Sequence, residues 1–269
     1  ILPMLPHKNL IPDINLTPYS IWLATVVVSG ISYLSYLLKR YVFHESGVLV
    51  SGIIGGLYSS TATISVLARK SRKASAQEAN EYVAAMLLAV SMMFLRFMIL
   101  ILIFSREIFM SIYPYLLIMS VVAAVVAWFI HSRQRRSKDL SADSEEEDSS
   151  NPLEFKVALI FATLFVIFTV LTHYTLVYAG TGGLNLLSFV SGLSDITPFI
   201  LNLLQNTGSV AVLIVVACSM QAIISNILVN MFYALFFAGK GSKLRPWILG
   251  GFGTVIGVNL VLLLFFYFI

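Results

Sequence analysis

Long apolar runs with almost no charge dominate this sequence. Several of them contain about 20 residues or more, which is the length that an α-helix needs to cross the hydrocarbon core of a bilayer. Charged residues make up only 11% of the chain, against about 25% in a soluble domain. Because lipid offers the backbone no hydrogen-bond partner, such spans must be helices or a closed barrel, and these runs are too long and unbroken for barrel strands. The sequence therefore predicts an all-α, polytopic membrane protein.

The apolar runs divide the chain into two halves. We expect eight membrane helices, at 17–42, 47–69, 80–105, 109–131, 154–179, 184–205, 209–238 and 246–269. Between the fourth and fifth, "HSRQRRSKDLSADSEEEDSSNP" is basic, then acidic and Ser-rich, with no apolar face to bury, so it predicts a flexible linker. The predicted domains are a connector at 1–16 from an absent N-terminal region, a four-helix repeat at 17–131, the cytoplasmic linker at 132–153 and a second four-helix repeat at 154–269.

The two halves share a sequence pattern. When "SGIIGGLYSSTATISVLA" is aligned with "SGLSDITPFILNLL" so that Gly56 matches Gly192, Ser59 falls on Asp195 and Thr61 on Thr197. About 20 residues later both halves carry a small-x-Ser-Met pattern. Four spans in each half give both halves the same orientation, so we expect a parallel repeat.

The distribution of Lys and Arg predicts an orientation. With eight spans, the N-terminus, the loop after Arg69, the linker and the C-terminus share one side, which carries most of the basic residues. The positive-inside rule places that side in the cytoplasm. We expect the protein in the inner membrane of the cell. The loop "GKGSKLR" runs against the rule. The basic clusters lie at helix ends without interleaved aromatic residues, so we do not expect nucleic-acid binding.

Two segments combine small residues with polar ones inside the apolar runs. In the first, Gly55 and Gly56 precede a group of hydroxyls, which we assign to a pathway for an ion or solute. That group is Ser59, Ser60, Thr61 and Thr63. Glycines allow close approach of another backbone, and hydroxyls that bond to the preceding turn bend a helix. In the second segment, Gly192 and Pro198 flank Asp195 and Thr197. Matched Gly/Pro-interrupted segments indicate a transporter site; the alternative is ordinary small-residue packing.

Arg96 and Asp195 are the two charges that lie deep within predicted spans. Charges at membrane depth are costly and usually face a protein interior or an aqueous path. We expect them to line the pathway, and a pairing between them across the two halves is a further hypothesis. The alternative is a structural ion pair or an arginine that reaches the membrane surface.

Neutral polar groups accumulate in the second half. Asn202, Gln221 and Asn226 are assigned to the same pathway, with bonding between neighbouring helices as the alternative. Asn226 and Asn230 lie one turn apart and share a helix face. The sequence has no HExxH, GxSxG or P-loop motif and no paired intramembrane carboxylates, so we expect neither an enzyme nor a resident cofactor. The sequence is compatible with a bound or transported ion but does not identify it.

The sequence resembles a known family. Six stretches carry the resemblance, namely "NLTPY", "GGLYSSTA", "ARKSR", "LAVSMMFLR" with Arg96, "NPLEFKVALIF" and "GLSDIT". Together they resemble the C-terminal membrane domain of large bacterial and archaeal MgtC/SapB-like proteins. That domain carries no assigned function. The resemblance implies an MgtC-like N-terminal domain as a partner of this one. It also implies MgtC-like regulation of ion homeostasis.

We therefore expect a transporter or channel that passes a small ion or polar solute through a polar midplane site between two repeats. The lipid bilayer is its main partner, and a homo-oligomer is an open alternative. A non-transporting regulator that packs against partner helices is the competing hypothesis.

Overall fold

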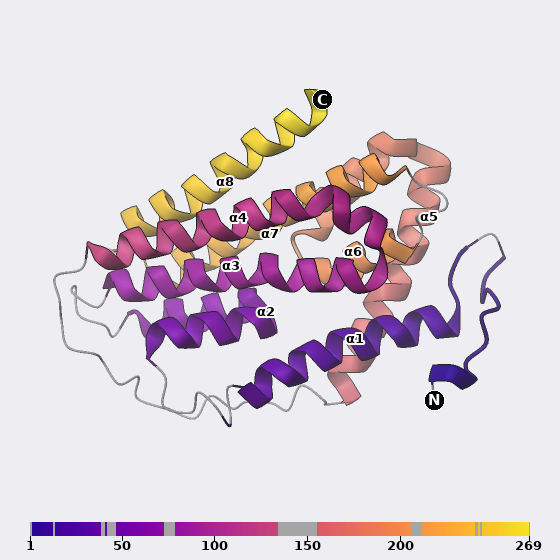
Figure 1. The fold of residues 1–269 in the computed structure, drawn as a ribbon, viewed down its shortest axis with the longest axis horizontal. Coiled ribbons are helices and arrows are strands. Elements are labelled where there is room, and N and C mark those ends of the chain that lie inside the picture. The colour runs from indigo at the N-terminus through magenta and orange to yellow at the C-terminus, as the bar shows by residue number, and fades with distance from the viewer. Residues whose placement is uncertain are drawn as a thin grey trace.

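The computed structural model describes residues 2–12, 14–38, 41, 47–72, 79–133, 155–205, 211–239, 242 and 244–268. This part of the chain is helical (Figure 1), which confirms the predicted all-α bundle of eight α-helices. A short 3₁₀ helix, Leu2–Met4, precedes them. The α-helices are α1 (Pro18–Leu37), α2 (Val48–Lys70), α3 (Ala79–Phe104), α4 (Arg106–Ser132), α5 (Phe155–Ser191), α6 (Ile196–Gln205), α7 (Val212–Ala238) and α8 (Arg245–Phe268).

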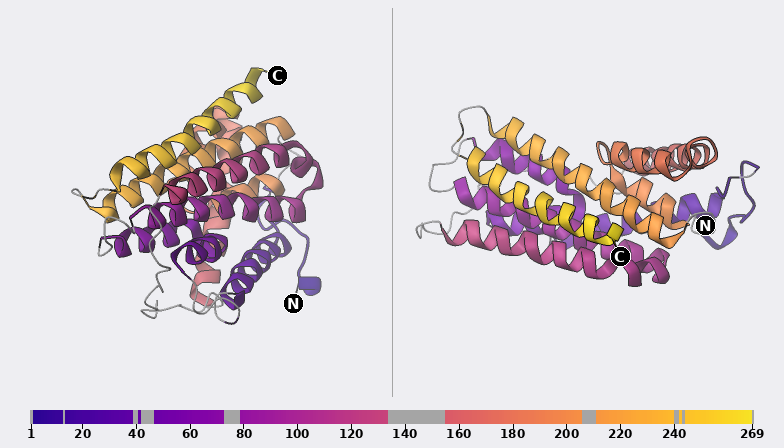
Figure 2. Two further views of the ribbon diagram at one scale, coloured as in Figure 1. Left: turned by 60° about the vertical axis from the view of Figure 1, so that its left-hand side comes forward. Right: turned by 90° about the horizontal axis from the view of Figure 1, so that it is seen from above.

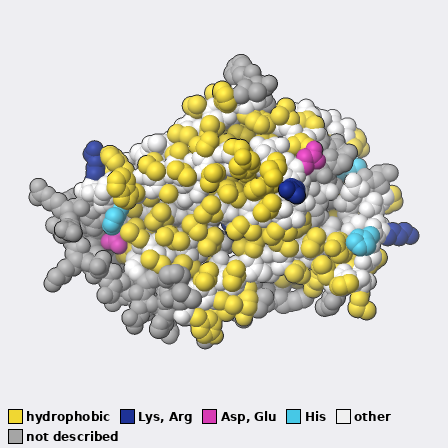
Figure 3. Space-filling view, viewed as in Figure 1, with side chains coloured by type: hydrophobic (Ala, Val, Ile, Leu, Met, Phe, Trp, Pro, Cys, Tyr) yellow, Lys and Arg dark blue, Asp and Glu magenta, His cyan; other side chains and the backbone are white. Residues whose placement is uncertain are grey.

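Seven of these helices are long and apolar enough to cross a membrane, and α6 is shorter. The face of the molecule seen in Figure 3 is largely hydrophobic, with few charged side chains. A soluble protein would not expose such a surface, because large apolar patches promote association in water. The protein is a multi-pass membrane protein.

Local sequence signals set the helix starts. α1 begins with a capping box, in which the backbone N–H of Ser20 donates to Oγ1 of Thr17 at 3.0 Å and the N–H of Thr17 donates to Oγ of Ser20 at 3.1 Å. Ser105 alone separates α3 from α4, and its extended backbone reverses the chain so that the two helices pack side by side. Between them, Oγ of Ser91 donates to the carbonyl of Ser120 at 2.8 Å.

α2 is interrupted at Ser59, whose φ of −157° and ψ of 106° are non-helical. A Cβ atom built on Gly55 would lie 2.4 Å from Oγ1 of Thr63. Residues eight apart in a straight helix are about 12 Å apart along its axis. The two arms, 48–58 and 60–70, therefore fold back on each other as a helical hairpin, which we call hairpin 1.

The first arm of hairpin 1 runs in the same direction as α3. A Cβ on Gly52 would lie 2.3 Å from the carbonyl oxygen of Ala85, and one on Gly56 would lie 2.5 Å from Cα of Ala89. Both positions advance by four residues, so the two segments are parallel. Consecutive membrane-spanning helices joined by a short loop would be antiparallel, which means that α2 returns to the end of the bundle from which it came.

A second hairpin occupies the matching place in the other half. Gly180, with a positive φ of 59°, separates 155–179 from the arm 181–191, and the chain breaks again before α6. The arm 181–191 runs parallel to α7, because Asn185 contacts Cys218, and Ser188 contacts Gln221 three residues further along both segments. We call the arm 181–191 with α6 hairpin 2. α6 returns toward the end of the bundle at which the arm 181–191 begins. This follows because Nε2 of Gln205, at the end of α6, donates to the carbonyl of Ser20 at the start of α1.

The equivalent helices of the two halves run in opposite directions. Arg72, just after α2 and before α3, donates to the carbonyl of Phe236 at 3.2 Å near the end of α7. The start of α3 therefore lies beside the end of α7, and α4 and α8 are likewise antiparallel to each other (Figures 1 and 2). α5 crosses the other helices at a steep angle.

These directions correct the predicted relation between the halves. The sequence-based count treated 47–69 and 184–205 as full crossings and so predicted parallel repeats. Because each of these segments folds back, and because α3 and α7, like α4 and α8, run in opposite directions, the two halves are related as an inverted repeat. The start of α1 and the end of α4 consequently lie at opposite ends of the bundle (Figure 1), not at the same end as predicted. The predicted linker at 132–153 lies largely outside the described residues.

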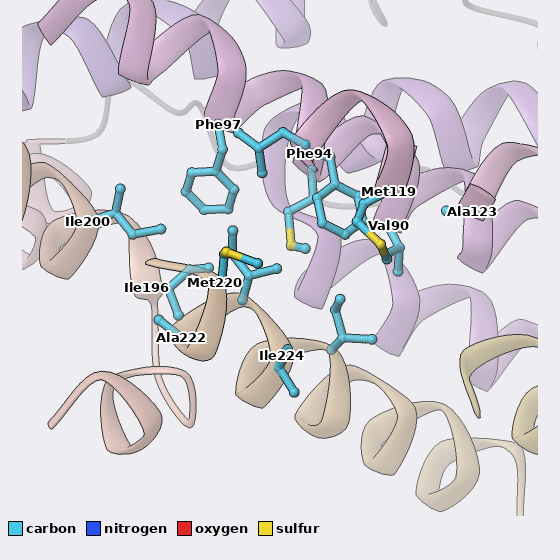
Figure 4. Packing of buried hydrophobic residues seen from close by; sticks show 14 of the residues in the cluster. Val90, Phe94, Phe97, Met119, Ala123, Ile196, Ile200, Met220, Ala222 and Ile224 are labelled. Atoms are coloured by element: carbon cyan, nitrogen blue, oxygen red, sulfur yellow. The ribbon is translucent and has the colours of Figure 1, made fainter. Parts of the chain in front are cut away.

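A central apolar core fixes the hairpins against the long helices. Figure 4 shows Phe97 of α3 facing Ile196 and Ile200 of α6 and Met220 of α7, with Phe94 further along α3 beside Met119 of α4. These side chains are almost fully buried. The core holds the start of α6 against the middle of α3, where Arg96 lies.

Candidate functional site at the hairpin breaks

Arg96 connects the two hairpins. Its Nη1 donates to the carbonyl of Tyr58 at 2.8 Å, directly before the break of hairpin 1. Its Nη2 lies 3.5 Å from Oγ1 of Thr197, directly after the break of hairpin 2. The breaks of both hairpins therefore meet around one guanidinium near the middle of α3.

Asp195 reaches the same place from the other side. Its Oδ1 accepts a hydrogen bond from the backbone N–H of Thr197 at 2.9 Å, so Asp195 caps the start of α6. Thr197 thus contacts Arg96 through its side chain and Asp195 through its backbone, and the two opposite charges attract each other across it. Thr197 is buried, whereas Asp195 is exposed on the surface of the protein.

Hairpin 1 provides a second helix start at this place. Oγ of Ser59 lies 3.4 Å from the backbone N of Ala62, in the position of a cap for the arm 60–70. Ser60 is buried, and Thr61 and Thr63 are half-buried. The carbonyl of Tyr58 ends the first arm and has lost its helical partner, which explains why Arg96 is bonded to it.

In hairpin 2 an asparagine takes the corresponding place. Nδ2 of Asn226 on α7 lies 3.3 Å from the carbonyl oxygen of Gly192 and 3.4 Å from that of Ser194. Nδ2 of Asn230 in turn donates to Oδ1 of Asn226 at 3.1 Å. The shared helix face predicted for the two asparagines is thus the face that contacts the break.

The glycines at the breaks are sites of close helix packing. A Cβ on Gly192 would lie 2.4 Å from Cβ of Ser225 and 2.6 Å from the carbonyl oxygen of Ala222, just as Gly56 meets the backbone of α3. Pro198 lies in the first turn of α6, where a missing N–H leaves no helical bond unmade. It therefore begins a helix, and the interruption lies just before it.

Two predicted pathway residues make contacts elsewhere. Nδ2 of Asn202 donates to Oγ1 of Thr169 on α5 at 2.6 Å, and Oε1 of Gln221 accepts from Oγ of Ser188 at 2.8 Å. Both bonds join neighbouring helices. Sequence analysis did not identify the carbonyl of Tyr58 as part of the site, because a backbone carbonyl becomes available only where the helix is interrupted.

Residues 26–238 match a family described as "Domain of unknown function (DUF4010)". The chain belongs to this family. The matched region of DUF4010 contains both hairpins, Arg96 and Asp195, and it ends at the last residue of α7. This result agrees with the predicted domain of unknown function, whereas the link to MgtC/SapB-like proteins stays a prediction.

The chain is also similar to an uncharacterized protein of Aquifex aeolicus (strain VF5). The two are 26% identical over 220 residues, which cover 81% of this chain and 94% of that protein. No solved structure matches the chain.

Proposed function

We propose that this protein is a transporter or channel that passes a small ion or polar solute between its two hairpins. The observation that carries the proposal is the meeting of two interrupted, inverted hairpins at Arg96 and Thr197. Broken helices at membrane depth are tolerated where they are buried in protein or line a cavity. Inverted repeats with half-helix ends at the bilayer midplane are the arrangement that many secondary transporters use to bind substrates and coupling ions.

The half-helix ends can act on a solute of either charge. The starts of the arm 60–70 and of α6 carry partial positive charge, and the ends of 48–58 and 181–191 carry partial negative charge. Arg96 and Asp195 add one full charge of each sign. The site thus offers both donors and acceptors to a desolvated solute without requiring a net charge in the membrane.

The charge distribution supports this topology. In the inverted arrangement, five of the Lys and Arg residues that the structure describes lie at the end of the bundle that holds the end of α4, namely Arg69, Lys70, Arg72, Arg133 and Arg245, whereas Lys8 and Arg106 lie at the opposite end. The loop "GKGSKLR", which contradicted eight crossings, now agrees with the positive-inside rule. We place this end in the cytoplasm and the start of α1 outside it.

Cysteine labelling tests the topology. In a Cys218→Ser background, an Ala211→Cys variant at the start of α7 should react with a membrane-impermeant maleimide added to intact cells. A Ser132→Cys variant at the end of α4 should react only after the membrane is opened. Both positions are exposed, so accessibility within the protein does not separate them. Labelling of both positions from the same side would contradict the inverted repeat.

Flux through liposomes tests the function. We expect the purified protein to pass a subset of cations, anions or small polar solutes, and we expect Asp195→Asn to lower that flux at least about tenfold while the protein stays folded. Asn would keep the cap on α6 but would remove the charge. Absence of flux for every solute tested would favour the alternative, a regulator whose hairpins are association faces.

A further inference from the structure

The ends of the first arms in the two hairpins are equivalent in the inverted repeat but differ in charge. At the end of 48–58, a full positive charge is fixed in place, because Arg96 donates to the carbonyl of Tyr58 at 2.8 Å. At the end of 181–191, the carbonyls of Gly192 and Ser194 meet the neutral amide of Asn226 at 3.3 and 3.4 Å. Since the end of a helix carries partial negative charge, hairpin 2 lacks the compensation that hairpin 1 has.

The break of hairpin 2 is also rich in oxygen atoms. One amide nitrogen reaches the carbonyls of both Gly192 and Ser194, so these two oxygens converge on α7, and each has a second lone pair. The carboxylate of Asp195 follows directly in the chain, and only one of its oxygens is used for capping α6. Each of these atoms is a ligand that hard cations prefer.

A further oxygen on α7 lacks a partner. Oγ of Ser225 is buried and has no hydrogen-bond partner within the described residues. Its side chain is 0% exposed. Oγ of Ser225 points at the break, since it would lie 2.7 Å from a Cβ on Gly192. An unpaired acceptor in such a place is costly, and a bound cation would satisfy it.

We infer that hairpin 2 binds a dehydrated monovalent cation, such as Na⁺ or K⁺, between the Gly192–Asp195 break and Ser225 of α7. A single carboxylate with neutral oxygens suits one positive charge, whereas divalent cations commonly require more carboxylates. The inference rests on the proposed function and names the coupling ion of that site. Binding would hold the two arms of hairpin 2 together at α7 and so link the cation to the position of the hairpin.

Thermal unfolding of the purified protein in detergent tests this site without a transport assay. NaCl, KCl and LiCl are compared with choline chloride at equal ionic strength. We expect at least one alkali-metal cation to raise the unfolding midpoint saturably, by about 5 °C at concentrations far above its dissociation constant. Equal midpoints in all four salts would overturn the inference.

Three variants locate the effect. Ser225→Ala, which removes the unpaired oxygen, should abolish the cation-dependent rise. Ser219→Ala is the matched control, because Ser219 is equally buried on α7 but its Oγ bonds to the carbonyl of Val215, and it should retain the rise. Asn226→Asp should lower the cation concentration for half the effect about tenfold, since it puts a charged ligand where the amide faces the carbonyls of Gly192 and Ser194. A rise that survives in Ser225→Ala, or is unchanged in Asn226→Asp, would overturn the assignment to hairpin 2.

Failure of this inference is distinguishable from failure of the proposed function. Flux that proceeds equally in choline and in alkali-metal salts, with no cation effect on the midpoint, would refute the cation site and keep the transporter. A cation effect on the midpoint without any flux would keep the site and refute the transporter.

Discussion

Replacing Arg96 with alanine should lower flux through the protein by at least about 30-fold. The guanidinium donates to the carbonyl of Tyr58 and lies within 3.5 Å of the hydroxyl of Thr197, so its loss leaves both breaks without their shared donor. A hydrogen bond to a charged group contributes about 2 kcal/mol, and each 1.4 kcal/mol is a factor of ten. Flux into liposomes, measured on protein that elutes as a single species, is the readout.

Two further variants serve as comparisons for Arg96→Ala. Arg96→Lys keeps the charge but offers a compact ammonium in place of a planar fork, so it should retain part of the flux. Arg106→Ala removes an exposed arginine at the start of α4 and should leave flux unchanged. If Arg96→Ala transports as well as the wild type, the guanidinium only fastens the hairpins, and the regulator hypothesis gains support.

Replacing Gly56 with alanine should destabilise the protein strongly. The added Cβ would lie 2.5 Å from Cα of Ala89 and 2.6 Å from its carbonyl oxygen, and backbone atoms cannot move aside as a flexible side chain can. Hairpin 1 would have to separate from α3, which should cost about 3 kcal/mol and lower the unfolding midpoint by roughly 6–12 °C.

Gly253→Ala is the matched control for this substitution. Gly253 also lies within a helix, but a Cβ there would meet no atom within 4 Å. Because alanine favours helix over glycine, this variant should be neutral or slightly more stable. Equal midpoints for the two variants would show that hairpin 1 does not pack on α3 through Gly56.

Much of the candidate site follows from local sequence. The alignment that placed Ser59 on Asp195 pairs the two residues that lie at the breaks, because each supplies a side-chain oxygen that caps the following arm. Arg96 was identified by its charge inside an apolar run, and the structure places it between the hairpins. Short polar side chains and deep charges are visible in a sequence since few other positions in a membrane tolerate them.

The direction of the chain could not be obtained in the same way. The segment 48–70 contains enough apolar residues to cross a bilayer, and hydropathy cannot distinguish a crossing from two arms that turn back at Ser59. Contacts distant in sequence decide this, such as that between Gly56 and Ala89. One wrong count of crossings in each half then turned an inverted repeat into a parallel one. The anomalous charge of the loop "GKGSKLR" was the signal that could have revealed the error.

The short arms have an electrical consequence. Each arm of the two hairpins contains about ten or eleven residues, so it spans roughly 15 Å, half the hydrocarbon thickness. If water follows each hairpin to its tip, the insulating layer between the two solutions shrinks to the few residues around the breaks. The whole membrane voltage then falls across that thin layer, where one elementary charge gains about 2.3 kcal/mol per 100 mV. A cation that enters or leaves the Gly192–Asp195 break would cross much of this field, so the occupancy of the site would respond to voltage.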